Sequence, residues 1–419
     1  MAGVARDPQQ TPPASYARFA VLLPLLLAAQ PVATDSYLPA LPAIARDLGS
    51  ATTSLTAFVL AFGAAQLGFG PLADRVGRRP VLLVGLVVYV LAAFACALAP
   101  DTFWLTTARA AQGLAMAAIL VCARASVRDL YSARHGLQVM ARGLSGLGAV
   151  ALVAPLLGAW LVQALGWRAV LAAMGAYGLA LVGICWRWFG ESLPASAGAA
   201  AGVAPDTRPP WRQVLGNRAF QVWSAVSATS YGGIFCFLLL SPMVYITLLG
   251  FSPVVYGWIP AGASLVYIVS TQACGRLLPR LGVERTVQLA ACCSLAGALI
   301  QAVGWLLWPG SALPLLAGHA VYVLGHGVHQ PCGQAGSVQD LPEQAGRAVS
   351  WSGFLMMSCA FTAGQIAALF APPDVRFGPW PMVLPLVLAG VVLAWLAFAV
   401  VPGVERAGTR APHPSTGAA

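Results

Sequence analysis

Charge is what this sequence has least of. Charged residues make up 9% of the 419-residue chain, whereas an ordinary soluble protein carries roughly 25%. So few charges cannot cover a surface that faces water, which excludes a soluble globular enzyme. Intrinsic disorder is excluded as well, because 59% of the residues are hydrophobic and disordered chains are poor in apolar residues.

Lysine is absent altogether, and all 23 basic residues are arginine. Against 13 acidic residues they give a net charge of +10. In a membrane protein such an excess belongs to cytoplasmic loops, so we expect no nucleic-acid partner. The nine cysteines all fall within apolar stretches, which argues against a disulfide framework.

What the sequence has in abundance is long apolar runs. A run of about 18 residues or more is long enough to cross a bilayer as a helix. Twelve such runs are present, at residues 19–37, 53–72, 80–99, 103–125, 143–165, 169–189, 219–240, 254–278, 287–308, 313–338, 349–370 and 382–401. None alternates as a barrel strand does, so the sequence predicts an all-α integral membrane protein. Residues 1–16 are polar, and we expect no cleaved signal peptide.

The distribution of arginine predicts the orientation. With the N-terminus inside, the outer loops hold only Arg46, Arg168 and Arg376, and the inner segments hold most of the others. Cytoplasmic loops carry the excess of basic residues in membrane proteins. We therefore expect both termini to be cytoplasmic.

The chain divides into two halves. Residues 190–217 are the longest polar interruption and, being rich in Ala, Gly, Ser and Pro, are predicted to be a flexible linker. Six runs precede it in a first half (1–189) and six follow in a second half (218–405), before a tail (406–419). Four positions repeat at an offset of 205, pairing Gly70, Leu72, Arg75 and Gly77 with Gly275, Leu277, Arg280 and Gly282. Parallel six-helix repeats are typical of one large class of transporters.

One loop carries a specific motif. Residues 70–79 read G-P-L-A-D-R-V-G-R-R, and this segment resembles the signature loop of the major facilitator superfamily. Residues 33–42, 108–131, 241–246 and 345–353 narrow the resemblance to the Bcr/CflA-type drug:proton antiporters. The resemblance implies the major facilitator fold, with twelve transmembrane helices in two six-helix halves. It also implies an antiporter motif in the fifth span, of which Pro155 and Gly158 remain.

Two charged residues fall well inside the spans, away from the span ends. Asp35 lies 17 residues after Arg18, about 25 Å along the helix, and Arg109 lies eight residues after Asp101, about 12 Å in from the outer side. The two can share a depth. Ionisable residues within a span are costly and are functional candidates by default. We interpret Asp35 and Arg109 as the proton-coupling pair. Asp35 is protonated in one state and is deprotonated in another, by pairing with Arg109 or by the arrival of substrate.

The signature loop has a different predicted role. Asp74 and Arg78 are spaced i, i+4 and can pair within the loop. The resemblance implies a conformational latch in which this aspartate contacts the eleventh helix, beginning near Arg347. The residues of the predicted latch are Gly70, Asp74, Arg75, Gly77, Arg78 and Arg79.

Other polar and aromatic residues are candidates for a drug cavity. Gln112 lies one turn from Arg109 and is placed to bind substrate or to orient the guanidinium. The aromatic candidates are Tyr37, Phe58, Phe62, Tyr231 and Phe235, although packing is the better explanation of any single one of them. His319, His326 and His329 lie near one face of the tenth span. Their alternative roles are a metal or proton-relay site, polar lining of the cavity, and interhelical hydrogen bonding.

The predicted function is proton-coupled efflux of small amphipathic drugs, chloramphenicol-like or bicyclomycin-like, by alternating access across a bacterial inner membrane. The alternative is a sugar or amino-acid carrier of the same fold, and the proton site is compatible with antiport or symport. We expect the chain not to be an enzyme, because no nucleophile–base pair or metal cluster is found. The expected driving force is the proton motive force, with no cofactor and no metal, and the expected partners are substrate, protons and lipid around a monomer.

Overall fold

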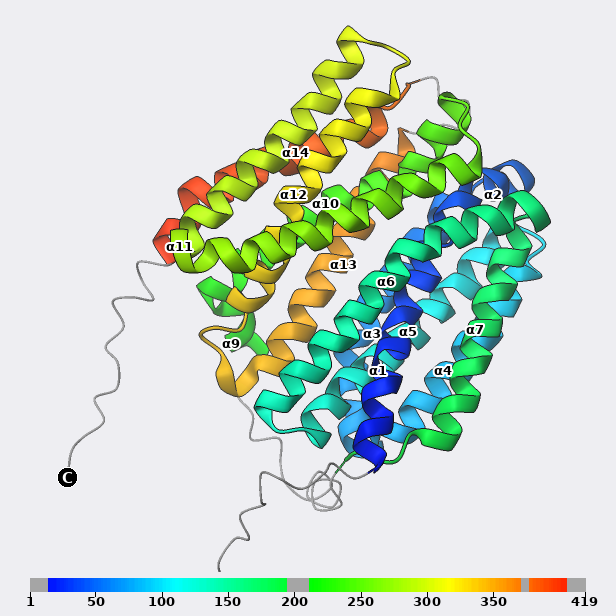
Figure 1. The fold of residues 1–419 in the computed structure, drawn as a ribbon, viewed down its shortest axis with the longest axis vertical. Coiled ribbons are helices and arrows are strands. Elements are labelled where there is room, and N and C mark those ends of the chain that lie inside the picture. Colours follow the sequence, from blue (N-terminus) through cyan, green and yellow to red (C-terminus); the bar gives the residue numbers. More distant parts are fainter. Residues whose placement is uncertain (1–13, 194–210, 371–376, 405–419) are drawn as a thin grey trace, which may run out of the picture.

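A computed structural model describes residues 14–193, 211–370 and 377–404 of the chain (Figure 1). Within these ranges the regular elements are all helices. The tail predicted at 406–419 and the greater part of the predicted linker lie outside the described residues.

The first half is a bundle of six crossings. The first crossing is built from α1 (Ala14–Thr34), the short helix η1 (Leu38–Ala40) and α2 (Leu41–Leu48). The other five are α3 (Thr52–Val76), α4 (Arg78–Ala97), α5 (Thr102–Leu130), α6 (Ala133–Leu165) and α7 (Trp167–Trp188). The second half contains α10 (Arg218–Pro242) with η2 (Met243–Leu248), α11 (Pro253–Leu307), α12 (Ala312–Gly336), η3 (Pro342–Gln344), α13 (Ala345–Leu369), and α14 (Trp380–Trp395) with η4 (Leu396–Val400).

The helix α11 accounts for two crossings. Its 55 residues would span about 82 Å, far more than the roughly 30 Å of a bilayer core. Gly282, at φ 75° and ψ 170°, interrupts it between the two stretches. Ten described helices are long and apolar enough to cross a membrane. Because α11 crosses twice, these ten helices make eleven crossings. The 25-residue α12, which is less apolar because it contains three histidines, is the twelfth. The predicted fold class is confirmed.

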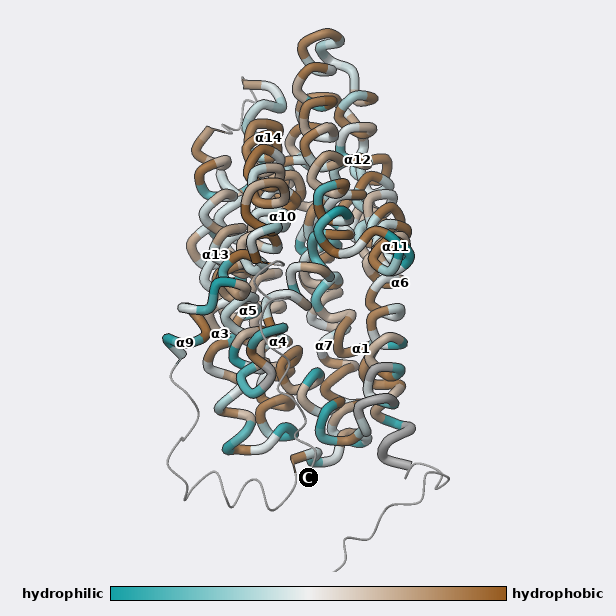
Figure 2. The backbone as a smooth tube through the Cα atoms, turned by 90° about the vertical axis from the view of Figure 1, so that its left-hand side faces the viewer, coloured by the Kyte–Doolittle hydropathy of each residue, from teal (hydrophilic) through white to brown (hydrophobic). Residues whose placement is uncertain are grey.

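The two bundles lie side by side (Figure 1). They are joined by two pairs of helices, since α3 packs against α13 and α6 packs against α11. Figure 2 shows apolar residues along most of the helical length and hydrophilic ones gathered mainly near helix ends and around the short helix α9 (Trp211–Gly216). Such a surface fits a lipid environment.

We call the two ends of the bundle the Gly77 end and the Gly49 end, after the turns found there. Gly77, between α3 and α4, and Gly49, after α2, both have positive φ. The halves touch toward the Gly49 end, where Thr56 Oγ1 of α3 hydrogen-bonds to Gln365 Oε1 of α13 at 2.9 Å. Gly257 of α11 packs there against Pro155 and Ala159 of α6.

The predicted linker contains a short helix near its C-terminal end. Residues 211–216 form a short helix, α9 (Trp211–Gly216). Val214 of α9 is fully buried in a cluster with Phe220 and Ala348, and Trp211 stacks on Trp351 of α13 at 5.8 Å. The sequence did not reveal this helix, because residues 190–217 are mostly small residues and proline and contain few large apolar side chains.

Candidate functional site

The first crossing is broken between α1 and η1. The helix α1 ends at Thr34, residues 35–37 form a turn, and Pro39 directs the chain into the 3₁₀ helix η1. In the turn, the backbone N–H of Tyr37 donates to the carbonyl of Thr34 at 3.2 Å. In a continuous α-helix it would donate to Ala33, four residues back. The break therefore releases the carbonyl of Ala33.

Arg109 of α5 occupies that position. Its side chain is fully buried, and it donates to the Ala33 carbonyl at 3.1 Å and to Gln112 Oε1 at 2.6 Å. The guanidinium carbon lies 4.3 Å from the ring centroid of Tyr37 and 4.5 Å from that of Phe58. The faces of aromatic rings attract cations, most strongly away from water. The positive charge is thus held by two rings and two oxygens rather than by a carboxylate.

Asp35 makes its side-chain hydrogen bond to a neighbouring residue in this conformation, and its role in proton coupling stays a prediction. Its carboxylate accepts a hydrogen bond from Thr34 Oγ1 at 2.7 Å. The ion pair expected with Arg109 is not formed in this conformation, because the freed carbonyl of Ala33 binds the guanidinium instead. The two residues do share a depth, since Arg109 binds the chain two residues before Asp35. The Asp35 carboxylate interacts electrostatically with Tyr231 and Tyr256 of the other half.

The fifth-span motif supports this broken segment. At Gly158 a Cβ atom would lie 2.7 Å from the Cα of Ser36 and would meet its carbonyl oxygen as well. Only glycine allows α6 to approach the turn so closely. The carbonyl of Pro155, one turn earlier, contacts Gly257 of α11 in the other half. These two residues place α6 between the Asp35 turn and the second half.

Gly113 of α5 is a further glycine of the site, for which the sequence predicted no role. A Cβ on Gly113 would collide with the backbone of Phe58. Gly113 therefore lets α3 approach α5 until Phe58 covers Arg109. Close approach of two helices is a common use of glycine in membrane bundles, and its place directly after Gln112 was the available signal.

The predicted aromatic residues form two stacks, one in each half. Phe58 stacks on Phe62 with centroids 6.4 Å apart, and Tyr231 stacks on Phe235 at 6.3 Å. Tyr37 makes a hydrogen bond of 2.7 Å with Ser54 Oγ. Apart from the half-buried Tyr231, these rings are buried in this conformation. They gather around Arg109 and the contact between the halves, where they are packed against protein.

A groove of about 1360 Å³ lies elsewhere, between α10, α13 and α14. Its lining includes the exposed apolar side chains of Ile366, Leu384 and Leu388. None of the predicted substrate residues lines it. Because these apolar side chains are exposed on the surface of the bundle, they would contact lipid chains in a membrane.

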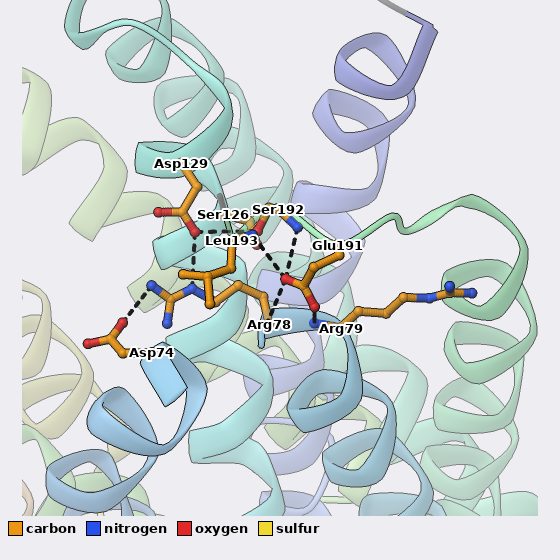
Figure 3. A network of polar contacts seen from close by, with 8 residues as sticks. All are labelled: Asp74, Arg78, Arg79, Ser126, Asp129, Glu191, Ser192 and Leu193. Carbon is orange, nitrogen blue, oxygen red and sulfur yellow. Dashed lines mark hydrogen bonds and ion pairs between the residues drawn. The ribbon is translucent and has the colours of Figure 1, made fainter. Parts of the chain in front are cut away.

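The signature loop is fixed by a network of charges at the Gly77 end (Figure 3). Arg78 makes the predicted i, i+4 ion pair with Asp74 at 2.6 Å and a second ion pair with Asp129 of α5 at 3.0 Å. Arg79 donates to the carbonyl of Trp186 at 3.0 Å. The loop is thereby bound to α5 and α7 of its own half.

Glu191 is a member of this network that the sequence did not reveal. Its carboxylate accepts the backbone N–H groups of Arg78 at 2.9 Å and Arg79 at 3.1 Å, at the start of α4 (Figure 3). A carboxylate at this position caps the helix and meets the positive end of its dipole. Partial burial raises the pKa of Glu191, but the backbone N–H groups of Leu193, Arg78, Arg79 and Ser192 outweigh burial and lower it overall. An acid directly after the sixth span was the only sequence signal.

The remaining latch residues lie around this network. Gly77 has φ 106°, and a Cβ there would lie 2.6 Å from Glu191 Oε2. Gly70 has open space around its Cα, and Arg75 is exposed. Arg128 of the first half comes near the start of α13, since its Nη1 would be 3.7 Å from a Cβ on Gly346. Asp74 binds Arg78 in this conformation, rather than the eleventh-span helix that the resemblance implies.

No three His, Cys, Asp or Glu side chains come together as metal ligands in the part of the chain that the structure describes. The site therefore consists of a buried cation, a carboxylate at a helix break and two aromatic stacks. Such a site can bind a small organic molecule and can hold or release a proton.

The family model described as "Major Facilitator Superfamily" matches residues 25–372. Among curated proteins, the chain is 30% identical to "Chloramphenicol resistance protein" of Pseudomonas aeruginosa, over 89% of this chain and 88% of that one. It is 29% identical to "Multidrug resistance protein D" of Escherichia coli (strain K12), over 90% and 95%. It is 25% identical to "Bicyclomycin resistance protein homolog" of Haemophilus influenzae, over 84% and 88%.

Solved structures share the fold. A bacterial homolog of the human lysosomal transporter Spinster, in an inward-facing and unoccupied conformation, superposes with a TM-score of 0.71 at 15% identity, covering 93% of this chain and 97% of that one. A D-xylose-proton symporter superposes with a TM-score of 0.65 at 14% identity, covering 90% and 96%.

Proposed function

Because the chain belongs to the major facilitator superfamily, we propose that it is a proton-coupled efflux carrier for small amphipathic drugs. As a member of that family it is a transporter that moves small molecules across a lipid bilayer, and it is not an enzyme. The finer statements, on the drug class, the coupling ion and the direction of transport, are the proposal.

The names of the relatives support the drug class. Resistance to chloramphenicol, to several drugs and to bicyclomycin is named for three proteins that match most of this chain. The site has the matching chemistry, because drug-sized ligands are bound by mostly apolar surfaces with a few polar groups. The stacks Phe58–Phe62 and Tyr231–Phe235 supply the apolar faces, and Gln112 and Arg109 supply polar groups. We expect these rings to separate around substrate when the halves part.

The observation that carries proton coupling is the position of Asp35. Its carboxylate lies at a break in a transmembrane helix, and its nearest hydrogen-bonding partner is the neutral hydroxyl of Thr34. A charged carboxylate within the membrane is costly unless it is paired or hydrated. Binding a proton removes that charge, so protonation favours the conformation in which Asp35 is least hydrated. The bound proton thereby biases the equilibrium between the two conformations.

In the proposed cycle, a proton enters from outside and drug leaves from inside. Deprotonation of Asp35 exposes a negative charge close to Arg109, whose contact with Ala33 can then be exchanged for the carboxylate. The proton motive force is the energy source and no resident cofactor takes part. We place the Gly77 end in the cytoplasm of a bacterium, with both termini on that side of the inner membrane, and the working unit is a monomer.

The test is transport by the purified full chain in liposomes with an imposed pH gradient. Chloramphenicol is the first drug to use, followed by bicyclic and cationic compounds. Accumulation of drug on the acidic side, against the movement of protons, is the expected result. Movement of drug in the same direction as protons would overturn antiport, and transport of a sugar or amino acid alone would overturn the drug class.

A further inference from the structure

The three histidines of α12 are buried within the second half. His319, His326 and His329 are 3%, 7% and 0% exposed. They are spaced i, i+7 and i+10, which places them near one face of the helix. The face that carries His319 and His326 is directed toward α10.

The two histidines on this face differ in their contacts. His319 lies flat on the ring of Phe237, with centroids 3.3 Å apart. His326 Nδ1 makes a hydrogen bond of 2.9 Å with Ser230 Oγ of α10. The rings of Tyr231 and Tyr267 lie 6.4 Å and 5.5 Å from the His326 ring. His319 is thus packed against an apolar ring, whereas His326 has polar neighbours on two other helices.

Tyr231 connects His326 to the proposed proton site. It is half-buried, neighbours His326, and interacts electrostatically with Asp35 of the first half. His326 is 14 residues from the start of α12, or about 21 Å along that helix, so it lies in the middle of the bundle as Asp35 does. The two ionisable side chains therefore lie on opposite halves with one tyrosine between them.

Few other charges surround His326. Its neighbours are Ser230 and Tyr231 on α10, Tyr267 on α11, and His319 and His329 on α12 itself, both of which interact with it electrostatically. The helices α12 and α14 carry no Asp, Glu, Lys or Arg. The charged residues of α10, α11 and α13 lie toward the Gly77 end of their helices, and they are Arg218, Arg276, Arg280, Glu284, Arg285 and Arg347. A proton gained or lost by His326 is therefore the main change of charge available to the centre of the second half.

Close packing fixes the helix that carries these residues. A Cβ on Gly325 or on Gly318 of α12 would collide with the second stretch of α11, and a Cβ on Gly327 would lie 2.5 Å from Ser270 of the first stretch. Ser270 in turn donates to the carbonyl of Leu324. The imidazole of His326 is thus presented from a rigid element, as a residue that must bind and release a proton reproducibly requires.

We propose that His326 is a second proton-binding group of the transport cycle, placed in the second half opposite Asp35 and oriented by Ser230. The proposal rests on proton coupling as proposed above. Imidazole is the side chain best suited to exchange protons between about pH 5 and 8. The carrier would then have one proton-binding group in each half, so that both halves change charge when drug is exchanged for protons.

The experiment counts protons on the purified full chain. A pH-indicator dye in weakly buffered detergent solution measures protons released when chloramphenicol, or the drug that wild type carries best in liposomes, is added. His326→Asn is compared with His319→Asn, the matched control on the same face of the same helix. We expect wild type and His319→Asn to release the same number, and His326→Asn to release up to about one proton fewer per drug molecule near pH 6.5. An unchanged count in His326→Asn over that range overturns the proposal.

A second variant and a measurement without drug make the test independent of folding and of the choice of substrate. Ser230→Ala keeps the imidazole and removes its hydrogen-bonding partner, so we expect the pH midpoint of proton release to move while the number of protons stays the same. In protein labelled with ¹⁵N in histidine, we expect the signal that His326→Asn removes to report protonation between about pH 5 and 8. An imidazole that stays neutral throughout, with and without drug, overturns the proposal. If wild type carries drug but releases no protons, proton coupling itself is wrong, which is a different result.

Discussion

Arg109 donates a hydrogen bond to the carbonyl oxygen of Ala33 at 3.1 Å, and this carbonyl is available because the first transmembrane helix ends one residue later. One contact thus joins the buried cation of α5 to the turn that carries Asp35. The break leaves a backbone oxygen without its helical partner, and the guanidinium supplies the missing donor. The position of Asp35 is therefore set by a backbone feature.

Arg109→Lys tests whether the shape of the guanidinium matters beyond its charge. Lysine keeps the charge but cannot stack in a plane between Tyr37 and Phe58 while donating to two oxygens. We expect the free energy of unfolding to fall by about 1–3 kcal/mol, the cost of leaving a buried polar group unpaired, and drug transport to fall with it.

The control for this variant is Arg168→Lys. Arg168 also donates to a carbonyl, that of Ala99 at 3.3 Å, and covers the ring of Trp167 at 4.2 Å, but it is exposed. Its replacement should change stability by less than about 0.5 kcal/mol. Equal thermal stability and transport for the two variants would show that the buried arrangement has no special role.

Gly158→Ala tests the close contact between α6 and the turn that carries Asp35. The added methyl group would collide with the backbone of Ser36, and overpacking of this kind costs about 1–3 kcal/mol. We expect a lower thermal midpoint, measured by the reaction of buried cysteines with a thiol-reactive dye, and reduced transport. Gly183→Ala is the control, because that glycine has open space around it and alanine is the better helix former. A midpoint for Gly158→Ala at or above that of Gly183→Ala would contradict the close contact.

Glu191→Gln tests the cap of α4. Glutamine replaces one of two accepting oxygens by a donor, so we expect a loss of about 0.5–2 kcal/mol at neutral pH. The pKa of Glu191 is lowered in the folded protein. The stabilisation is therefore complete above the ordinary pKa of glutamate and is lost as the pH falls through the lowered value.

The stability difference between wild type and Glu191→Gln should accordingly be constant near neutrality and shrink in acid. Unfolding measured from neutral pH down to about pH 4 checks this. Glu343→Gln, at an exposed carboxylate in η3, is the control and should show little difference at any pH. A difference for Glu191→Gln that grows as the pH falls would contradict the assigned role.

Much of the fold could be predicted from the sequence, because spans follow from hydropathy alone. The twelve runs, the two halves and the signature loop needed no knowledge of tertiary contacts. The break at Asp35 was harder, because Asp35 falls within the apolar run at residues 19–37, which reads as one continuous helix. Hydropathy responds to side chains and does not record where a backbone carbonyl loses its partner.

The candidate site shows the same limit. Depth along two helices placed Asp35 and Arg109 near each other, but depth cannot tell which oxygen the guanidinium binds. Glu191 was missed because its partners are backbone N–H groups more than a hundred residues earlier in the chain, which no local pattern encodes. The helix α9 was missed because its apolar anchors are few within a window of small residues and proline.

The central claim is that the Asp35 carboxylate couples drug movement to protons. The most direct measurement compares wild type, Asp35→Asn and Asp47→Asn in liposomes, with and without a pH gradient. Asp47 belongs to the same crossing but accepts a hydrogen bond from Trp167 Nε1 at 2.7 Å, near the Gly49 end. The account predicts that Asp35→Asn inserts normally and still exchanges drug down its own gradient but no longer accumulates drug in response to the pH gradient, while Asp47→Asn accumulates it as wild type does. Gradient-driven accumulation by Asp35→Asn at the wild-type level would contradict the account.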